Sequence, residues 1–356
     1  WFQSSLLVSV GALGRGAPFK ECVTHGWTVD GEGKAMHKSL GNGMDPAEIF
    51  DKYGADLLRL WAGSSDYHVD VRCSDEIFKQ LSQNYLKFRN TCKFCLDNLV
   101  NFDPNDLVKP QDMLPLDKWA LTRLNNLIGK VFGWYDNYEF HSVSHAINDF
   151  CVVDLSSFYF DIIKDRLYCD EAEGLERRSA QTALYLILDA MTRMFAPILA
   201  FTCDEVWLAM PHRAEDDARN VLFNEMVRPY TEYALSAEEM SKWSRIAALR
   251  NAVNGALEQA RADKVIGKSL EADVTLTVPQ EDAFLAEMSE EALADLFIVS
   301  QVTLTAGDEV KVSVKAAQGA KCGRCWKVLH SVSAVGEHEA LCPRCAAVMA
   351  KLPKVE

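Results

Sequence analysis

Two Cys-x-x-Cys pairs near the end of the sequence constrain its fold more than any other feature. The pairs are Cys322 with Cys325 and Cys342 with Cys345, and sixteen residues lie between them. Zinc ribbons have this spacing, with about fifteen to twenty residues between two such pairs. Four thiolates complete a tetrahedral shell around Zn²⁺ and leave no position for water, so the pattern predicts one structural zinc per chain. Two disulfides, or four free thiols, are the alternative.

The other cysteines do not repeat this arrangement. The chain has 11 cysteines, and among the others Cys92 and Cys95 share the pair spacing but lie inside a helical pattern without a second pair nearby. We expect these two to pack in a core, because cysteine is among the most buried residue types. The composition favours metal-bound thiols over a disulfide framework, so we expect a cytoplasmic protein.

Charge is distributed unevenly along the chain. The formal net charge is −14, which argues against a protein that coats nucleic acid with its whole surface. Residues 280–309 carry eight acidic and no basic side chains, whereas residues 310–356 carry eight basic and three acidic ones. The C-terminal segment is therefore predicted to face a polyanion, with a plain solvated surface as the alternative.

Basic and aromatic residues lie in and beside the two cysteine pairs. They are Arg324, Trp326, Lys327 and Arg344. Cationic side chains bind phosphate groups, and an exposed indole can stack on an unpaired base. We predict that these four residues contact RNA.

A second candidate site is the stretch of residues 33–42, in which glycines at both ends enclose two lysines and a serine. Glycine lets the backbone approach a polyphosphate closely, while Lys38 and Ser39 can supply positive charge and a hydrogen bond. The pattern predicts a phosphate-binding loop. An ordinary solvated loop is the alternative that the residues alone leave open.

The first part of the chain has an α/β pattern. With 356 residues, of which 49% are hydrophobic, the chain is long enough for two or three cores. Within residues 1–62 we expect a buried helix at 6–13, a strand at 21–28 and a helix at 46–61 with Asp45 as its N-cap. No apolar run reaches the length of about 18 residues that a membrane span requires, so no membrane association is expected.

From residue 74 the pattern becomes helical and indicates a bundle. The predicted helices are 74–99, 116–135, 141–168, 178–210 and 236–263, the last with a capping box of Ser236 and Glu239. Five apolar residues at helical spacing are predicted to lie in the core, namely Leu155, Phe158, Tyr159, Ile162 and Ile163.

Alternation of apolar and polar residues returns after residue 270. The expected strands are 273–278, 301–305 and 310–314, with a helix at 281–296 between the first two. This order of elements indicates a small α+β region in front of the cysteine pairs.

Residues 35–42 resemble the Lys-Met-Ser-Lys-Ser signature loop of class I aminoacyl-tRNA synthetases. Three further stretches resemble the second half of the catalytic domain in the isoleucine, valine and leucine enzymes of that class, namely residues 1–7, 25–30 and 45–59. Residues 197–207 and 265–272 resemble the bacterial isoleucyl-tRNA synthetases in particular. The resemblance covers essentially the whole chain.

This resemblance implies a C-terminal fragment with a mixed, multidomain fold. The implied domains are the end of a Rossmann catalytic domain (1–64), an all-α anticodon-binding helical bundle (65–265), a small α+β domain (266–318) and a zinc-binding tail (319–356). The first half of the catalytic domain and the editing domain, both usual in the family, are not in this sequence. We therefore expect the chain to be part of a longer monomeric protein and to be inactive alone.

The resemblance also implies an activity. Family members activate isoleucine with ATP and Mg²⁺ and then transfer the acyl group to tRNA(Ile). By position in the signature, Lys38 is the implied catalytic residue, Met36 and Ser39 lie with it in the ATP site, and Trp1 lines the isoleucine pocket. Ala35 and His37 stand where the signature usually has lysine and serine. For Trp1, a plain core aromatic is the alternative.

Two other functions fit parts of the sequence. A non-catalytic zinc-ribbon protein that binds RNA would explain the cysteine pairs and the cations without any synthesis of aminoacyl-tRNA. The valyl and leucyl enzymes share the catalytic pattern, but the late four-cysteine arrangement favours the isoleucyl enzymes.

Overall fold

The computed structural model describes residues 2–335 and 338–352 and divides into two compact units. The first unit comprises residues up to 86 together with 134–145, and the second comprises 87–133 together with the chain from 146 onward. The four domains inferred from the resemblance divide the chain more finely and remain a prediction. None of the helices described is long and apolar enough to cross a membrane.

The sheet of the first unit is very small. It consists of two parallel strands, β1 (Thr28–Val29) and β2 (Val71–Arg72). The predicted strand at 21–28 is wrong except for its last residue, because the chain is irregular up to Thr28. A strand needs a partner for its hydrogen bonds, and β2 pairs with only one residue of this segment, Thr28.

The first helix of this unit is exposed. The α-helix α1 (Phe2–Leu7) continues as a short π-helix, η1 (Val8–Ala12). The prediction of a helix near 6–13 is therefore confirmed in part, but the prediction that it is buried is wrong, since Leu7 is 69% exposed and Leu13 57%. Two strands of two residues each do not form an apolar face wide enough to cover it.

A glycine divides the next predicted helix into two. These are α2 (Pro46–Tyr53) and α3 (Ala55–Ser64). The predicted N-cap is confirmed, because the Asp45 carboxylate accepts a hydrogen bond of 2.9 Å from the backbone of Ala47. Gly54 has φ +83°, a conformation that L residues rarely adopt and that ends the first helix.

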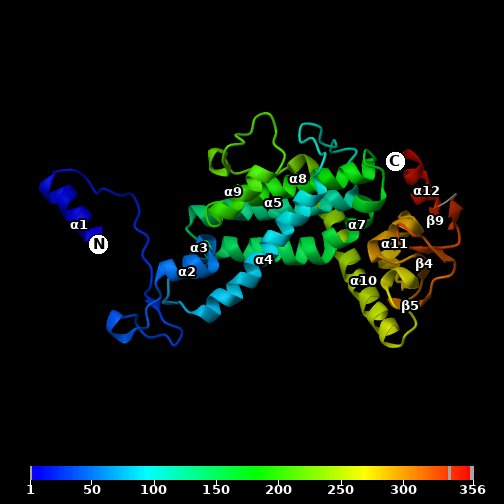
Figure 1. Ribbon diagram of the computed structural model, residues 1–356, viewed down its shortest axis with the longest axis horizontal. Coiled ribbons are helices and arrows are strands. Elements are labelled where there is room, and N and C mark those ends of the chain that lie inside the picture. Colours follow the sequence, from blue (N-terminus) through cyan, green and yellow to red (C-terminus); the bar gives the residue numbers. More distant parts are fainter. Residues whose placement is uncertain (1, 336–337, 353–356) are drawn as a thin grey trace. The chain divides into compact units, whose positions relative to one another are not determined.

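Helices make up most of residues 75–262 (Figure 1). They are α4 (Asp75–Asn98), α5 (Pro115–Asp136), α6 (Phe140–Asp149), the π-helix η3 (Phe150–Tyr159), α7 (Phe160–Cys169), α8 (Leu175–Phe195), α9 (Ala200–Ala209) and α10 (Ala237–Ala262). The predicted helix 178–210 is two helices, because Pro197 lacks an N–H and cannot continue α8. The predicted capping box of Ser236 and Glu239 at the start of α10 is confirmed.

The core of the bundle contains the predicted apolar stripe and a buried charge. Each of the five stripe residues is at most 8% exposed, which confirms that prediction. The fully buried Asp117 accepts hydrogen bonds from Tyr159 Oη at 2.7 Å and Ser179 Oγ at 2.5 Å. It also forms an ion pair with Arg166 at 2.8 Å. These groups join α5, η3, α7 and α8.

A three-stranded sheet follows the bundle. The central strand β3 (Ala272–Val278) pairs in parallel with β4 (Gln301–Ala306) and antiparallel with β5 (Lys311–Ala316). The predicted helix at 281–296 is a 3₁₀ helix, η7 (Gln280–Glu287), followed by α11 (Glu290–Phe297). This confirms the α+β region. Three further 3₁₀ turns lie between residues 221 and 271, namely η4 (Val221–Phe223), η5 (Thr231–Tyr233) and η6 (Ser269–Glu271).

The chain then forms two short hairpins and a helix. The hairpin strands are β6 (Ala320–Lys321) with β7 (Val328–Leu329), and β8 (Ser333–Val335) with β9 (His338–Leu341). The last helix is α12 (Pro343–Lys351). We call residues 319–352 the tail. The four paired cysteines form a buried cluster with Leu341 and with Cys169 at the end of α7.

Candidate metal centre

The four paired cysteines meet at one point in the tail. Their ligand atoms all lie within 4.8 Å of one another, and no other such group is found among the described residues. All four are at most 6% exposed. Cys325 Sγ and Cys342 Sγ are 3.8 Å apart. Four sulfur atoms at about 2.3 Å from a tetrahedral zinc are about 3.8 Å from each other, so the cluster fits this ion.

Local hydrogen bonds shape both pairs. The first pair lies on the turn between β6 and β7, where the backbone N–H of Trp326 donates to the carbonyl of Cys322 at 3.0 Å. The second pair begins α12, with Cys342 as its N-cap. The N–H of Gly323 donates to Ala340 O at 3.0 Å and joins the two pairs.

Burial and backbone hydrogen bonds shift the pKa values of the four thiols in different directions. Burial raises the pKa of Cys322, but backbone N–H groups of Cys342, Cys325 and Arg324 outweigh it and bring the pKa down to about 6. Burial raises the pKa of Cys325 to about 11 and also raises the pKa of Cys342 and Cys345. Zinc ligands must be thiolates, so a bound Zn²⁺ supplies the positive charge that holds all four in that form.

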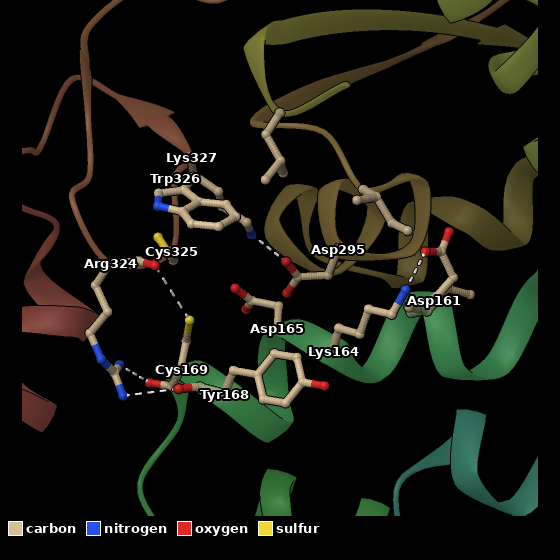
Figure 2. Close-up of a pocket in the computed structure, with 13 residues that line it drawn as sticks. Asp161, Lys164, Asp165, Tyr168, Cys169, Asp295, Arg324, Cys325, Trp326 and Lys327 are labelled. Carbon is tan, nitrogen blue, oxygen red and sulfur yellow. Dashed lines mark hydrogen bonds and ion pairs between the residues drawn. The ribbon is translucent and has the colours of Figure 1, made fainter. Parts of the chain in front are cut away.

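Three predicted RNA-contacting cations bind other parts of the second unit. Arg324 donates to the carbonyl of Tyr168 at 3.2 Å and to that of Cys169, at the end of α7 (Figure 2). Arg344 pairs with Asp165 and Asp170, the latter at 3.1 Å. Lys327 pairs with Asp295 of α11. These contacts attach the tail to α7 and α11.

The fourth predicted residue, Trp326, is different. Its side chain is 58% exposed. Contact of Arg324, Trp326, Lys327 and Arg344 with tRNA remains a prediction, but the described contacts give the three cations a second role. Sequence reasoning missed that role because their partners are far away in the chain.

Charge reversal at Arg344 is expected to loosen the tail. Arg344→Glu replaces two ion pairs by repulsion from Asp165 and Asp170, at a cost of roughly 1–3 kcal/mol after allowance for partial exposure. Amide hydrogen exchange in α12 and in the last turn of α7 should become roughly tenfold faster or more, while zinc content is unchanged. The matched control is Lys311→Glu, which changes an ion pair that is 71% exposed on both sides. Equal exchange in the two variants would contradict the described attachment.

The loop at 33–42 is organised by one asparagine. Asn42 accepts a hydrogen bond from His37 N at 3.0 Å and donates to Asp30 at 2.8 Å and to Ala35 O at 3.1 Å. The hydrogen bond from Asn42, with the backbone N–H groups of Lys34 and Glu32, lowers the pKa of Asp30. Sequence reasoning did not identify Asp30 or Asn42, although asparagine commonly bonds to nearby backbone in loops.

The predicted nucleotide-site residues lie in or near this loop. Lys38 begins a single 3₁₀ turn, η2 (Lys38–Leu40), and its side chain lies outside the described part of the structure. Ser39 is exposed and Met36 is half-buried. Trp1 lies outside the described residues. The assignments of these four residues remain predictions.

Cys92 and Cys95 are buried in α4, at 1% and 0% exposure. Burial raises the pKa of both thiols well above the ordinary value, which keeps them protonated. Their predicted packing role is confirmed.

Family models match three parts of the chain. Residues 1–74 match the model of tRNA synthetases class I (I, L, M and V), and residues 117–276 match the anticodon-binding domain of tRNA ligase. Residues 319–348 match the zinc finger found in FPG and IleRS. The four-cysteine cluster lies within that last match.

Nearly the whole chain is similar to part of several isoleucine–tRNA ligases. The chain is 46% identical over 362 residues to that of Geobacter sulfurreducens, covering 98% of this chain and 38% of the relative. It is 45% identical over 361 residues to that of Syntrophotalea carbinolica, with the same coverage, and 46% identical over 359 residues to that of Kosmotoga olearia, covering 99% and 39%. The chain thus spans less than two fifths of the length of these relatives.

Proposed function

The chain is a homologue of isoleucine–tRNA ligases over nearly its whole length and belongs with the class I tRNA synthetases, and on this premise we propose that it forms the tRNA-binding part of such a ligase. The observation that carries the proposal is the match of all three segments, synthetase, anticodon-binding and zinc finger, within one chain. In this proposal the complete ligase activates isoleucine with ATP and Mg²⁺ and transfers it to tRNA(Ile). It acts as a monomer in the cytoplasm.

Each part of the chain has a task in this proposal. The helical bundle holds the anticodon arm, where unpaired bases can be read by side chains. The zinc, one per chain, keeps the tail folded beside α7. The loop that contains Lys38 carries positive charge toward the phosphates of ATP, with Met36 and Ser39 beside it. Trp1 contributes to the isoleucine pocket. Phosphoryl chemistry of this kind depends on positioning and charge stabilisation.

Binding of tRNA by the chain tests the proposal. Filter binding should give a lower Kd for a tRNA(Ile) transcript than for a non-cognate transcript of equal length. Both affinities should fall as salt rises, because phosphate contacts release counterions. A chain that binds neither transcript at low salt, with its zinc in place, would overturn the proposal.

A further expected result concerns Lys38 in the complete ligase. Lys38→Ala should slow adenylate formation by roughly 10² or more, with a small change in isoleucine affinity, if the ammonium group stabilises charge in the transition state. Single-turnover kinetics and isoleucine titration measure the two quantities separately. Lys34→Ala is the matched control, since Lys34 is already paired with Glu32 at 2.6 Å. If Lys38→Ala formed the adenylate as fast as the control variant does, Lys38 would have no role in the reaction.

The competing functions have less support. A valyl or leucyl enzyme is disfavoured by the similarity of nearly the whole chain to isoleucine–tRNA ligases, three of which are 43–46% identical to it. If the chain were a non-catalytic zinc-ribbon protein, residues 1–74, which match the class I synthetase model, would have no role.

A further inference from the structure

A network of hydrogen bonds joins the two ends of the loop at residues 33–42. At its base, Asp30 follows β1 directly, and its Oδ1 accepts the backbone N–H groups of Glu32 at 3.0 Å and Lys34 at 2.9 Å. The backbone N–H of Asp30 in turn donates to the carbonyl of Lys34 at 2.9 Å. Asp30 therefore closes the turn through which the chain enters the loop.

Asn42 completes the network from the other end of the loop. Its Nδ2 donates to Oδ2 of Asp30 at 2.8 Å and to the carbonyl of Ala35 at 3.1 Å, while its Oδ1 accepts the backbone N–H of His37 at 3.0 Å. A primary amide has two N–H donors and one acceptor oxygen, so each of these groups has a partner here. We call Asp30 and Asn42 the clamp.

The clamp is anchored on the small parallel sheet. Val29, the last residue of β1, accepts a hydrogen bond of 2.8 Å from the backbone N–H of Cys73. Just before β1, the backbone N–H of Trp27 donates to the carboxylate of Asp70 at 2.7 Å. The backbone in front of Asp30 is thus held by the segment around β2. A loop bonded to such a fixed point has fewer conformations available than one held only at its ends.

The clamp contacts main-chain atoms of the signature stretch. It bonds to the carbonyl of Ala35 and the N–H of His37, the two positions at which this chain departs from the usual lysine and serine. Every residue has the carbonyl and every residue except proline has the N–H, so these departures leave the clamp intact. Lys38 begins η2 directly after His37. Its backbone therefore lies between two clamped positions, 37 and 42.

We propose that Asp30 and Asn42 are positioning residues for adenylate formation, because they fix the loop backbone from which Lys38 acts on the phosphates of ATP. The proposal rests on the proposed function and adds two residues to it. Neither residue contacts substrate in this proposal, and both act through the backbone on either side of Lys38. Misplacement of a reacting group by about 1 Å can cost roughly 10²-fold in rate, so a loosened loop should slow the reaction strongly.

The test uses the complete ligase and the isosteric change Asn42→Asp. This variant loses both N–H donors and places a second carboxylate against Asp30. Adenylate formation, measured by single-turnover kinetics, should slow roughly 10- to 100-fold. Isoleucine affinity and the transfer of isoleucine from enzyme-bound adenylate to tRNA should change little, since neither involves the departure of pyrophosphate. General damage to the fold would lower all three, and that result would overturn the proposal.

Two combined variants test whether the clamp acts through Lys38. The exchanged pair, Asp30→Asn with Asn42→Asp, again has one carboxylate facing one amide, so adenylate formation should be roughly threefold or more faster than in Asn42→Asp alone. Recovery should be partial, because the carbonyl of Ala35 still lacks its donor. In the Lys38→Ala background, Asn42→Asp should slow the reaction by roughly twofold or less, because the residue that the clamp positions is already gone.

The matched control is Asn105→Asp. Asn105 Nδ2 donates to Asp103 at 2.9 Å in the loop between α4 and α5, so this change brings two carboxylates together in the second unit. It should leave adenylate formation unchanged. If Asn42→Asp were as fast as this control, the clamp would have no positioning role. An exchanged pair that stayed as slow as Asn42→Asp, or an undiminished effect in the Lys38→Ala background, would also contradict the proposal.

These outcomes are distinct from failure of the proposed function. If the unaltered complete ligase forms isoleucyl-adenylate and Asn42→Asp forms it equally fast, only the clamp proposal is overturned. If the unaltered complete ligase forms no isoleucyl-adenylate, both proposals are overturned.

Discussion

Replacement of Cys345 by serine should release the zinc and unfold the tail while the helical bundle stays folded. The free energy of zinc binding, about 10–16 kcal/mol in small zinc modules, is the folding energy of the part that the metal closes. The zinc content measured by elemental analysis should fall from one ion per chain toward none. Amide hydrogen exchange should become fast in residues 319–352 and remain slow in α5 and α8. A strong chelator should have the same effect on the unaltered chain.

The matched control is Cys92→Ala. Cys92 has the same pair spacing with Cys95 but is buried in α4, far from the cluster in sequence. This variant should keep its zinc and its tail protection and lose only a modest amount of overall stability. Retention of one zinc by Cys345→Ser with a protected tail would show that the four sulfurs do not hold the metal.

Replacement of Asp117 by alanine should be the most damaging single change in the bundle. It leaves Arg166, whose side chain is 14% exposed, without its carboxylate, and it removes the acceptor of the Tyr159 and Ser179 hydroxyls. Loss of one partner from a buried ion pair costs about 3–5 kcal/mol. Urea unfolding followed by circular dichroism should show the loss as a lower midpoint.

Asp97→Ala is the control for that measurement. Asp97 pairs with Lys93 on the surface of α4, with 58% and 70% exposure of the two side chains. Exposed pairs of this kind contribute about 0–1 kcal/mol. If the two variants had equal midpoints, the Asp117 network would be no more stabilising than a surface pair.

Local patterns predicted the long elements well. Ser236 and Glu239 mark the start of α10, and Asp45 marks the start of α2, because a capping residue acts on the backbone a few positions away. The strand at 21–28 failed because pairing depends on a partner distant in sequence. The division at Pro197 could have been predicted, since proline inside a helical pattern usually ends the helix.

The same distinction applies to the candidate site. The spacing of four cysteines is local information, and it identified the four residues that the structure brings together. The partners of Arg324 and Arg344 are separated from them by 155 to 179 residues, so no pattern in the sequence indicates them. A cavity lined by Trp326, Tyr168 and Asp295 could not be predicted for the same reason. Its walls come from segments that are distant in sequence and meet only in the folded second unit.

The contacts between the tail and α7 join residues that are far apart in sequence, and this separation bears on the order in which the second unit folds. The tail is attached to α7 and to the residues just after it by bonds that join residues up to 180 positions apart, such as Lys351 with Glu171. Such contacts form late, because closing a long loop is unfavourable until the structure between its ends has formed. The carboxylates that receive the tail exist as a surface only after α7 has packed in the bundle. We therefore expect the attachment of this segment to be the last step in the folding of the second unit, after the bundle has formed.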